Sequence, residues 1–317
     1  MSSSRIVSVK LWGGLCNRLF QIAFCYSFAK KYDLTPIFYK YLFEYNDHTK
    51  QDETIRIIKE LIPHINISDD VVYATNFYII DVKGDLACKY IDIDLPKHTD
   101  KNILLQGYFQ SEKYFSILED SNIPHSKFLY TFVNDLIVNK NCSQNLNKYF
   151  IHIRMGDYVN HYLHYLGYKN YLAKSINLIL DRNPNATFII LSNEKDKKKI
   201  INEITQNTKI TLEDDNNLLS RINYEFEIDI NPTLDPLQSL KNMAMCVGGI
   251  CMNSSFSWFG AYLSRMISNI QYNTKYENAI QNAIFTMPNK WFNEKYISKD
   301  TYEDIYPQWD NLVILDI

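Results

Sequence analysis

The opening of this chain restricts it to few folds, because a strand, a tight turn, a helix and a second strand follow one another directly. Residues 5–11 alternate apolar and polar side chains, and Gly13-Gly14 interrupts them. Apolar side chains then recur at helical spacing from about Asn17 to Lys31, and residues 36–39 resume as a strand. Such a β-α-β opening predicts a parallel sheet with helices packed on it.

The second half of the chain repeats this alternation. Strands are predicted at 149–153, 187–191, 222–230 and 247–252, and helices at 168–180, from Asp235-Pro236 onward and after 253–255. A polar stretch, 139–148, separates the halves. We therefore predict two doubly wound α/β domains, residues 1–145 and 146–317, with the last helix packing back on the first domain.

Composition and charge exclude several classes of protein. The net charge of −3 gives no basic footprint for nucleic acid. The N-terminus lacks an apolar signal core, and apolar runs such as 243–252 are too short to span a bilayer, which predicts a cytoplasmic protein. Peripheral contact with a membrane and the oligomeric state are left open. The six Cys form no CxxC pair and are typical of buried free thiols.

Polar residues cluster where three of the predicted strands end. These clusters are residues 13–18, 152–158 and 253–257. Ligands of open parallel sheets bind outside the carboxyl ends of the strands. The three clusters are therefore the candidate binding loops.

Arg154 is the strongest single candidate, since it directly follows an apolar strand and Gly156 and Asp157 come soon after it. A guanidinium is a planar fork of donors that matches phosphate oxygens two at a time. The alternative is an ion pair between Arg154 and Asp157 that closes the turn. The segment by itself does not decide between them.

The other two clusters have structural alternatives as well. Ser254, Ser255 and Ser257, with the backbone around Phe256, lie where a helix begins, and the amides of a helix N-terminus suit a pyrophosphate. Ordinary capping by Asn253 or Ser254 is the alternative. The loop with Gly13 and Gly14 allows close backbone approach, and Asn17 adds a polar group, but a simple turn also accounts for it.

Four segments in order resemble one family, the inverting α-1,2-fucosyltransferases that use GDP-fucose. Residues 13–23 (GGLCNRLFQIA) resemble that family's GGLGNQMFQYA, and residues 107–115 (GYFQSEKYF) its GYWQSEKYF. Residues 152–158 match its HxRxGDY signature, and residues 253–263 match NSTFSWWGAYL. Residues 288–291 and 306–309 resemble its C-terminal end. The resemblance covers the chain from residue 5 to about 310.

This resemblance implies two Rossmann-like domains that face a cleft, the B-type glycosyltransferase architecture, with no metal or cofactor besides the GDP-fucose donor. Arg154 would bind the donor pyrophosphate and assist its departure, and His152 would contact the donor or orient Arg154. The donor-binding positions are Gly14, Asn17, Arg154, Asn253, Ser254, Ser255, Phe256 and Ser257. The first domain would be the acceptor side, and the second would bind the nucleotide sugar.

Four positions depart from the family pattern. Cys16 replaces a Gly and Arg18 a Gln in the loop expected nearest the reacting sugar, and Met155 replaces a second Arg. Phe259 replaces the second Trp. The Met155 change implies one cation fewer at the phosphates.

Inversion needs a base for the acceptor hydroxyl, unless the leaving phosphate takes its proton. Asp157 is the favoured base, and His161, His164 and Glu194 are the other candidates.

The sequence thus predicts a glycosyltransferase that moves L-fucose from GDP-fucose to a galactose-type glycan. One alternative keeps the fold and uses another GDP- or UDP-linked sugar. A second alternative is an inactive module that binds glycan or nucleotide. A glycoside hydrolase is disfavoured, because no pair of carboxylates can be placed across a bond.

Overall fold

The structure is a computed structural model that describes residues 5–44, 51–82, 88–118, 128–138, 143–164, 166–194, 196, 198–200, 223–228, 236–272 and 283–317. The chain divides into two compact units. The first comprises residues 1–132 with 298–307, and the second residues 133–297 with 308–317.

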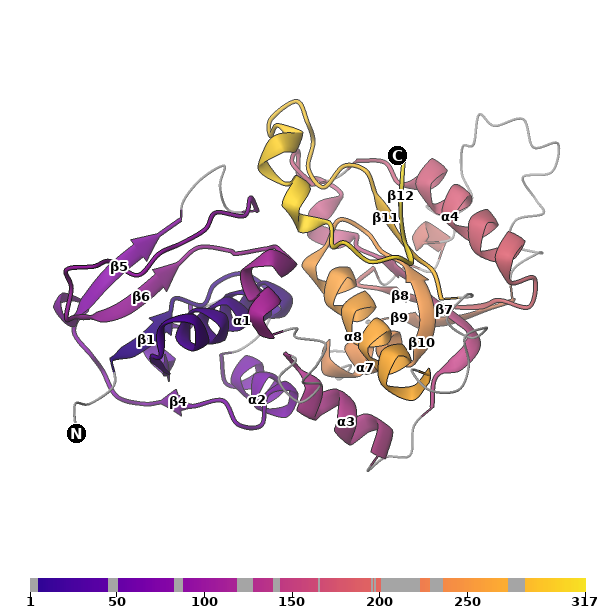
Figure 1. Cartoon of the computed structure of the whole chain (residues 1–317). Coiled ribbons are helices and arrows are strands. Elements are labelled where there is room, and N and C mark those ends of the chain that lie inside the picture. Colours follow the sequence, from indigo (N-terminus) through magenta and orange to yellow (C-terminus); the bar gives the residue numbers. More distant parts are fainter. Residues whose placement is uncertain are drawn as a thin grey trace. The chain divides into compact units, whose positions relative to one another are not determined.

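The first unit contains a parallel sheet in the order β2-β1-β6-β5 (Figure 1). Its strands are β1 (Ile6–Val9), β2 (Thr35–Pro36), β5 (Phe77–Asp81) and β6 (Asn102–Gln106). The helix α1 (Leu15–Tyr32) follows β1 directly, which confirms the predicted opening. Because β2 and β6 lie on opposite sides of β1, the strand order reverses there.

Aromatic packing holds α1 to the segment that follows β6. The ring of Phe24 lies 4.4 Å from that of Phe109, and the ring of Phe20 lies 6.2 Å from that of Phe115. Phe115 belongs to the 3₁₀ segment η4 (Glu112–Leu118). Further elements of this unit are α2 (Gln51–Leu61), the paired short strands β3 (Phe38–Tyr39) and β4 (Ile67–Ser68), and the 3₁₀ turns η1 (Lys40–Leu42) and η2 (Ala74–Asn76).

The second unit has a larger parallel sheet in the order β9-β8-β7-β10-β11-β12. Its strands are β7 (Asn145–Ile153), β8 (Thr187–Ser192), β9 (Asn223–Ile228), β10 (Cys246–Ile250), β11 (Phe285–Pro288) and β12 (Leu312–Leu315). In chain order this is 3-2-1-4-5-6, the strand order of a Rossmann fold. The predicted doubly wound topology is confirmed for this unit.

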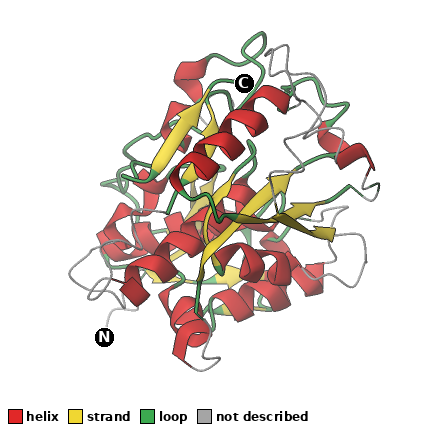
Figure 2. Cartoon of the chain, turned by 90° about the vertical axis from the view of Figure 1, so that its right-hand side faces the viewer, coloured by secondary structure: helices red, strands yellow, loops and turns green. Residues whose placement is uncertain are grey.

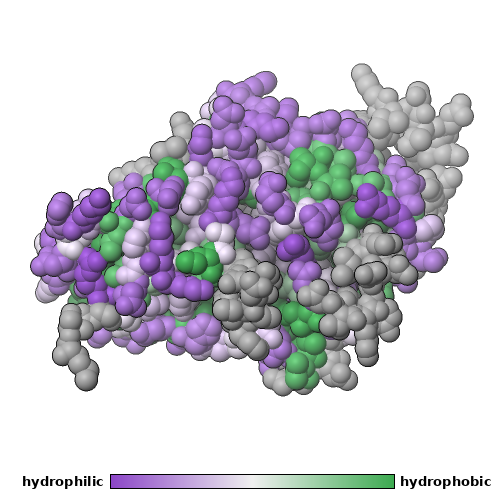
Figure 3. All heavy atoms as spheres, in the orientation of Figure 1, coloured by the Kyte–Doolittle hydropathy of each residue, from purple (hydrophilic) through white to green (hydrophobic). Residues whose placement is uncertain are grey.

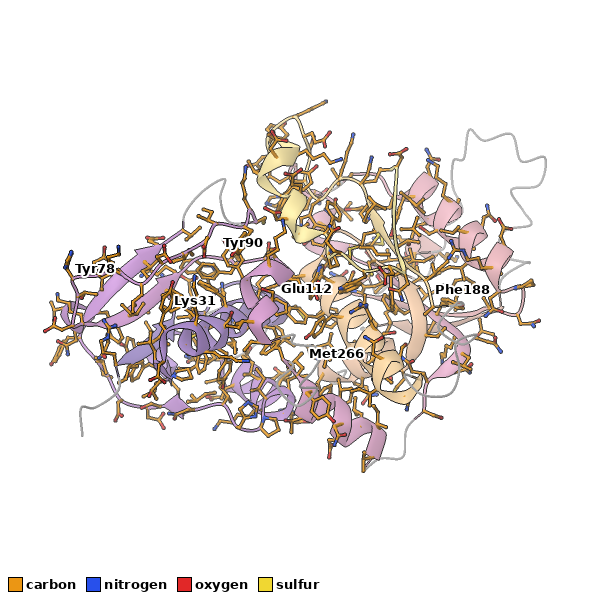
Figure 4. All side chains as sticks on the ribbon, in the orientation of Figure 1. Lys31, Tyr78, Tyr90, Glu112, Phe188 and Met266 are labelled. Carbon is orange, nitrogen blue, oxygen red and sulfur yellow. The ribbon has the colours of Figure 1, made fainter. Side chains whose placement is uncertain are left out.

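Figure 2 shows the strands with helices packed against them. Alternation along β7 divides its side chains between the two faces of the sheet. Tyr149, Ile151 and Ile153 join an apolar cluster with α4 (Lys169–Arg182). His152, on the other face, contacts α8 (Ser255–Tyr272), which packs beside α7 (Pro236–Ala244). Phe188 of β8 and Met266 of α8 are both buried in this unit (Figure 4). The period of two along the strand therefore decides which residues face α8.

The boundary between the units differs from the expected division at 145/146. It lies at 132/133, within α3 (Tyr130–Val138). The polar stretch 139–148 was expected to separate the halves. Its residues 139–142 lie outside the described residues. Residues 145–148, however, begin β7, where Asn145 aligns with Cys246 and Lys148 with Thr187. Side-chain polarity suggested a linker, whereas backbone pairing makes these exposed residues a strand.

The C-terminal segment has short turns and a strand where a final helix was expected. Residues 298–307 belong to the first unit and contain the 3₁₀ turns η8 (Lys299–Thr301) and η9 (Glu303–Ile305). The Tyr90 amide donates to the Asp304 carboxylate at 2.9 Å, and Lys113 forms an ion pair with the same carboxylate.

The described surface is mainly hydrophilic on the face shown in Figure 3, with hydrophobic residues near β5, where Ile79 stays 45% exposed. None of the described helices is long and apolar enough to cross a bilayer. Cys16, Cys25, Cys88, Cys246 and Cys251 are free and buried, as predicted, and Cys142 lies outside the described residues.

Candidate active site

The two polar clusters of the second unit lie side by side at the reversal of its strand order. β7 and β10 are neighbours, with Ile151 aligned to Ile250. Residues 152–158 follow the end of β7, and residues 253–257 follow the end of β10 (Figure 1). In doubly wound sheets this edge is where ligands bind. The topology therefore joins segments that are about a hundred residues apart in the chain.

Arg154 is half-buried directly beyond the last residue of β7. Its guanidinium carbon lies 5.2 Å from the centroid of the Tyr158 ring, close enough for a cation–π contact. Tyr158 ends the 3₁₀ turn η6 (Gly156–Tyr158). The chain thus folds back so that its own aromatic ring supports the cation.

Asn193 holds the loop that carries Arg154, a role that sequence reasoning missed. Its Oδ1 accepts the Met155 amide at 2.7 Å, and its Nδ2 donates to the Met155 carbonyl at 3.1 Å. Gly156 has φ +63°, and a Cβ there would lie 2.8 Å from Asn193 Nδ2. The predicted turn at Ser192-Asn193 after a strand was the available signal, but the partner of its amide is a tertiary contact.

His152 is buried and neutral. Burial, and then the charge of Arg154, lower its pKa from 6.5 to about 3. Its Nδ1 contacts the Ser257 hydroxyl, whose oxygen also accepts the Met252 amide at 3.2 Å. In the described structure Nδ1 is the one acceptor in reach of that hydroxyl, so we infer that Ser257 donates to Nδ1. The ring proton then lies on Nε2.

The start of α8 combines a capped end with exposed groups. Ser254 precedes the helix, and its Oγ accepts the Phe256 amide at 3.3 Å, which is the capping alternative raised above. Ser255 and Phe256 are nevertheless half-exposed, and the Phe256 ring lies 5.4 Å from that of His152. A helix of this length presents partial positive charge at its N-terminus.

Asn253 is buried and forms hydrogen bonds with groups of the protein itself. It is 1% exposed, and its Nδ2 donates to the carbonyls of His164 and Trp291 at 3.0 and 2.7 Å. Its Oδ1 is hydrogen-bonded to the Tyr168 hydroxyl. Asn253, like Ser257, therefore holds protein groups in place, and its predicted contact with the donor stays a prediction.

The candidate bases are distributed around the same edge. The Asp157 side chain lies outside the described part of the structure, so its pairing with Arg154 is untested. Glu194 follows β8, where its carboxylate accepts the Asp196 amide at 3.0 Å. His161 Nδ1 accepts the Leu163 amide at 3.3 Å, and the His164 ring stacks on Tyr158 at 4.6 Å. Across the described ranges, no group of three His, Cys, Asp or Glu could hold a metal ion.

The first unit has its own polar group at the reversal of its sheet. Asn17, at the start of α1, accepts a hydrogen bond of 2.7 Å from Gln110, which follows β6. Gly13 has φ +72°, and a Cβ there would lie 2.6 Å from Asn17 Nδ2, so this turn requires glycine. A Cβ at Gly14 would face open space. Gln110 was absent from the expected site residues.

A family model, Glycosyl transferase family 11, matches residues 89–295. The chain belongs to this family. Family 11 is the α-1,2-fucosyltransferase family, so the resemblance inferred from the motifs is confirmed. The match includes β7 and β10 and the polar clusters that follow them, residues 152–158 and 253–257.

Solved glycosyltransferase structures are also similar to this family 11 chain. One, a glycosyl transferase of family 9 from Veillonella parvula, is 8% identical with a TM-score of 0.43, over 100% of this chain and 88% of that chain. Another, the E. coli heptosyltransferase WaaC with ADP, is 8% identical with a TM-score of 0.40, over 98% and 90%. The comparison with curated proteins found no match.

The departures from the family 11 pattern lie inside the protein. Arg18 is 1% exposed, and it donates from Nε to the Gly13 carbonyl at 3.0 Å and from Nη2 to the Glu44 carbonyl at 2.6 Å. Cys16 and Phe259 are buried as well, and Met155 packs in the apolar cluster with α4. Arg18 thus has a structural role in holding its loop, and the expectation that Cys16 and Arg18 lie nearest the sugar stays a prediction.

Replacing Asn193 should loosen the Arg154 loop. Asn193→Ala removes the acceptor of the Met155 amide, whereas the Met155 carbonyl keeps the Tyr158 amide as a donor. An unsatisfied backbone group costs about 1–3 kcal/mol. We expect hydrogen exchange of the Met155 amide to accelerate at least about fivefold. Asn185→Ala, an exposed asparagine of the same unit, is the control. An unchanged hydrogen-exchange rate of the Met155 amide in Asn193→Ala would contradict the role of Asn193 in holding this loop.

The buried neutral imidazole should make the protein sensitive to acid. Between pH 6.5 and 3 the unfolded chain binds a proton that His152 in the native state does not. The free energy of unfolding is therefore unaffected by the titration of His152 above pH 6.5 and decreases as the pH falls towards 3. By pH 5 it should be smaller by about 2 kcal/mol, measured by urea unfolding. His152→Gln should remove this part of the pH dependence, and His98→Gln, at an exposed site, should retain it.

Proposed function

We propose that this family 11 glycosyltransferase moves L-fucose from GDP-fucose to a galactose-type glycan with inversion and without a metal ion. The observation that carries the proposal is the adjacency of Arg154 and the α8 N-terminus at the reversal between β7 and β10. Both groups suit a diphosphate, one as a cationic fork and the other as an array of amides.

The chemistry proposed for this edge is displacement at the anomeric carbon. The acceptor hydroxyl oxygen forms a bond to that carbon while the bond to the β-phosphate oxygen breaks, and GDP leaves with the electron pair. Arg154 stabilises the charge that develops on the departing oxygen, an electrostatic effect that dominates many catalysed reactions. The N-terminus of α8 contributes at the other phosphate oxygens through the amides that Ser254 does not cap. The hydroxyl proton passes to Asp157 in our proposal, or to the leaving phosphate.

His152 supports this arrangement as a neutral group. Its low pKa means that it adds no second cation at physiological pH. With Nδ1 engaged by Ser257, Nε2 carries the proton and can donate a hydrogen bond to the donor or to a group beside Arg154. Ser257 and Asn253 act as positioning residues, because both are buried and bonded to protein groups.

The first unit is proposed to contribute the acceptor side. Open space at Gly14 permits close approach of a ligand to the backbone. The hydrogen bond between Asn17 of α1 and Gln110, which follows β6, holds two side chains at the reversal between β1 and β6. These features support a ligand surface on this unit.

Arg154→Ala should lower transfer from GDP-fucose about 100- to 1,000-fold, because it removes the cation at the leaving group. Arg154→Lys keeps a charge without the fork and should recover part of the rate. Arg182→Ala, an exposed arginine of α4, is the control. Circular dichroism checks that each variant is folded. Near-normal transfer by folded Arg154→Ala would reject this role.

Nucleotide preference tests the donor. We expect GDP and GDP-fucose to raise the melting temperature, since a ligand at 100 times its Kd stabilises the native state by about 2.7 kcal/mol. UDP and UDP-sugars should give smaller shifts. Stabilisation by UDP-sugars alone would favour the same fold with another donor, and glycan binding without nucleotide binding or turnover would favour an inactive module.

A further inference from the structure

A chain of aromatic rings extends from Arg154 across the surface of the second unit. The Tyr158 ring, which supports Arg154, stacks on His164 at 4.6 Å and an angle of 14°. His164 lies 4.5 Å from His161, which stacks on Tyr162 at 5.2 Å and 10°. Tyr162 in turn meets Tyr296 edge to face at 4.9 Å. Each ring thus contacts the next, from the proposed leaving-group site outward.

The outer end of this chain is exposed. Tyr162 is 60% and Tyr296 59% exposed, while the inner rings of Tyr158, His161 and His164 are half-buried. Single exposed apolar residues are ordinary on a protein surface. Two tyrosines in edge-to-face contact, joined through stacked rings to a candidate catalytic arginine, form a more specific feature.

Hydrogen bonds fix this outer end in place. Asn293 donates from its amide to the Leu163 carbonyl at 2.9 Å and from Nδ2 to the Tyr162 carbonyl at 3.0 Å. The Tyr296 amide donates to the Asn293 carbonyl at 3.0 Å. Two segments 131 residues apart are thereby joined, and the two exposed rings keep a defined geometry. Such preorganisation lowers the entropic cost of binding.

We propose that Tyr162 and Tyr296 form a subsite on the second unit, additional to the acceptor surface proposed for the first unit, on which a pyranose ring of the glycan acceptor stacks by its C–H face. This inference rests on the proposed function, which supplies a sugar acceptor beside Arg154. An aromatic face matches the apolar face of a sugar, and a tyrosine hydroxyl can bond sugar hydroxyls at the edge. We call the pair the tyrosine platform.

The size and surroundings of the tyrosine platform favour a sugar over a protein partner. Two rings cover far less than the roughly 1,000 Å² expected of a protein interface. Exposed polar residues lie near them in the chain, among them Asn160, Glu294 and Lys295. A small apolar surface with exposed polar neighbours, connected to Arg154 through successive ring contacts, suits one or two sugar residues.

Acceptor kinetics at saturating GDP-fucose, with lactose as the acceptor probe, test the platform. Tyr162→Ala and Tyr296→Ala should each raise the acceptor KM about three- to tenfold, the range expected for loss of one aromatic contact. The kcat and the Kd for GDP should stay within about twofold, because neither ring contacts the proposed diphosphate site. Tyr162→Phe and Tyr296→Phe keep the rings and should restore the KM substantially. Tyr73→Ala removes an exposed tyrosine of the first unit and is the matched control.

Unchanged acceptor KM in the double alanine variant would overturn the platform while leaving the proposed function intact. If the wild type transfers no fucose, the proposed function fails and saturation-transfer NMR with lactose tests the platform separately. Transfer of saturation to lactose that disappears in the double variant would then support the subsite. Equal signals in both proteins, or none in the wild type, would overturn it.

Discussion

The pairing of β7 with β10 is the constraint on which the candidate site depends. These strands are neighbours because β8 and β9 extend the sheet on one side of β7 while β10, β11 and β12 extend it on the other. Helices leave a parallel sheet from the carboxyl ends of its strands, so the reversal leaves a crevice there. Arg154 follows the carboxyl end of β7, and the N-terminus of α8 follows that of β10. The two become neighbours because these strands are paired.

The alternation of side chains along β7 determines which of them face α4 and which face α8. Ile151 and Ile153 face α4, so His152 between them faces α8 and reaches Ser257. Beyond the strand, Met155 returns to the apolar cluster, and Asn193 holds its backbone from β8. Arg154 therefore lies in the chain between the end of β7 and the anchored Met155, and the Tyr158 ring supports its guanidinium.

The electrostatics of this edge follow from burial. A protonated imidazole beside Arg154 in a buried position is costly, and the low pKa of His152 reflects both effects. Because position 155 packs into the core, a methionine there contributes to packing. Arg154 and the helix N-terminus thus provide the positive charge in our proposal, while neutral groups set their orientation.

Local patterns in the sequence determined the elements and the loops. Alternating apolar residues predicted β1 and β9, and short apolar segments predicted β7, β8 and β10. Helical spacing predicted α1 and α4, and polar clusters marked the loops after β1, β7 and β10. The family followed from four motifs in order, which the family model over residues 89–295 confirms. The role of each site residue stays a proposal.

Contacts between distant segments were decided only by the tertiary structure. Sequence reasoning placed the domain boundary inside β7, because strand pairing through exposed residues has no apolar pattern. The clamp by Asn193, the internal bonds of Asn253 and Arg18, and the ring chain from Tyr158 to Tyr296 were missed. The physical reason is the same for all of them. A local pattern shows which face of an element is apolar. The partner of a polar or aromatic side chain, however, depends on the distant strand or turn that the fold places beside it.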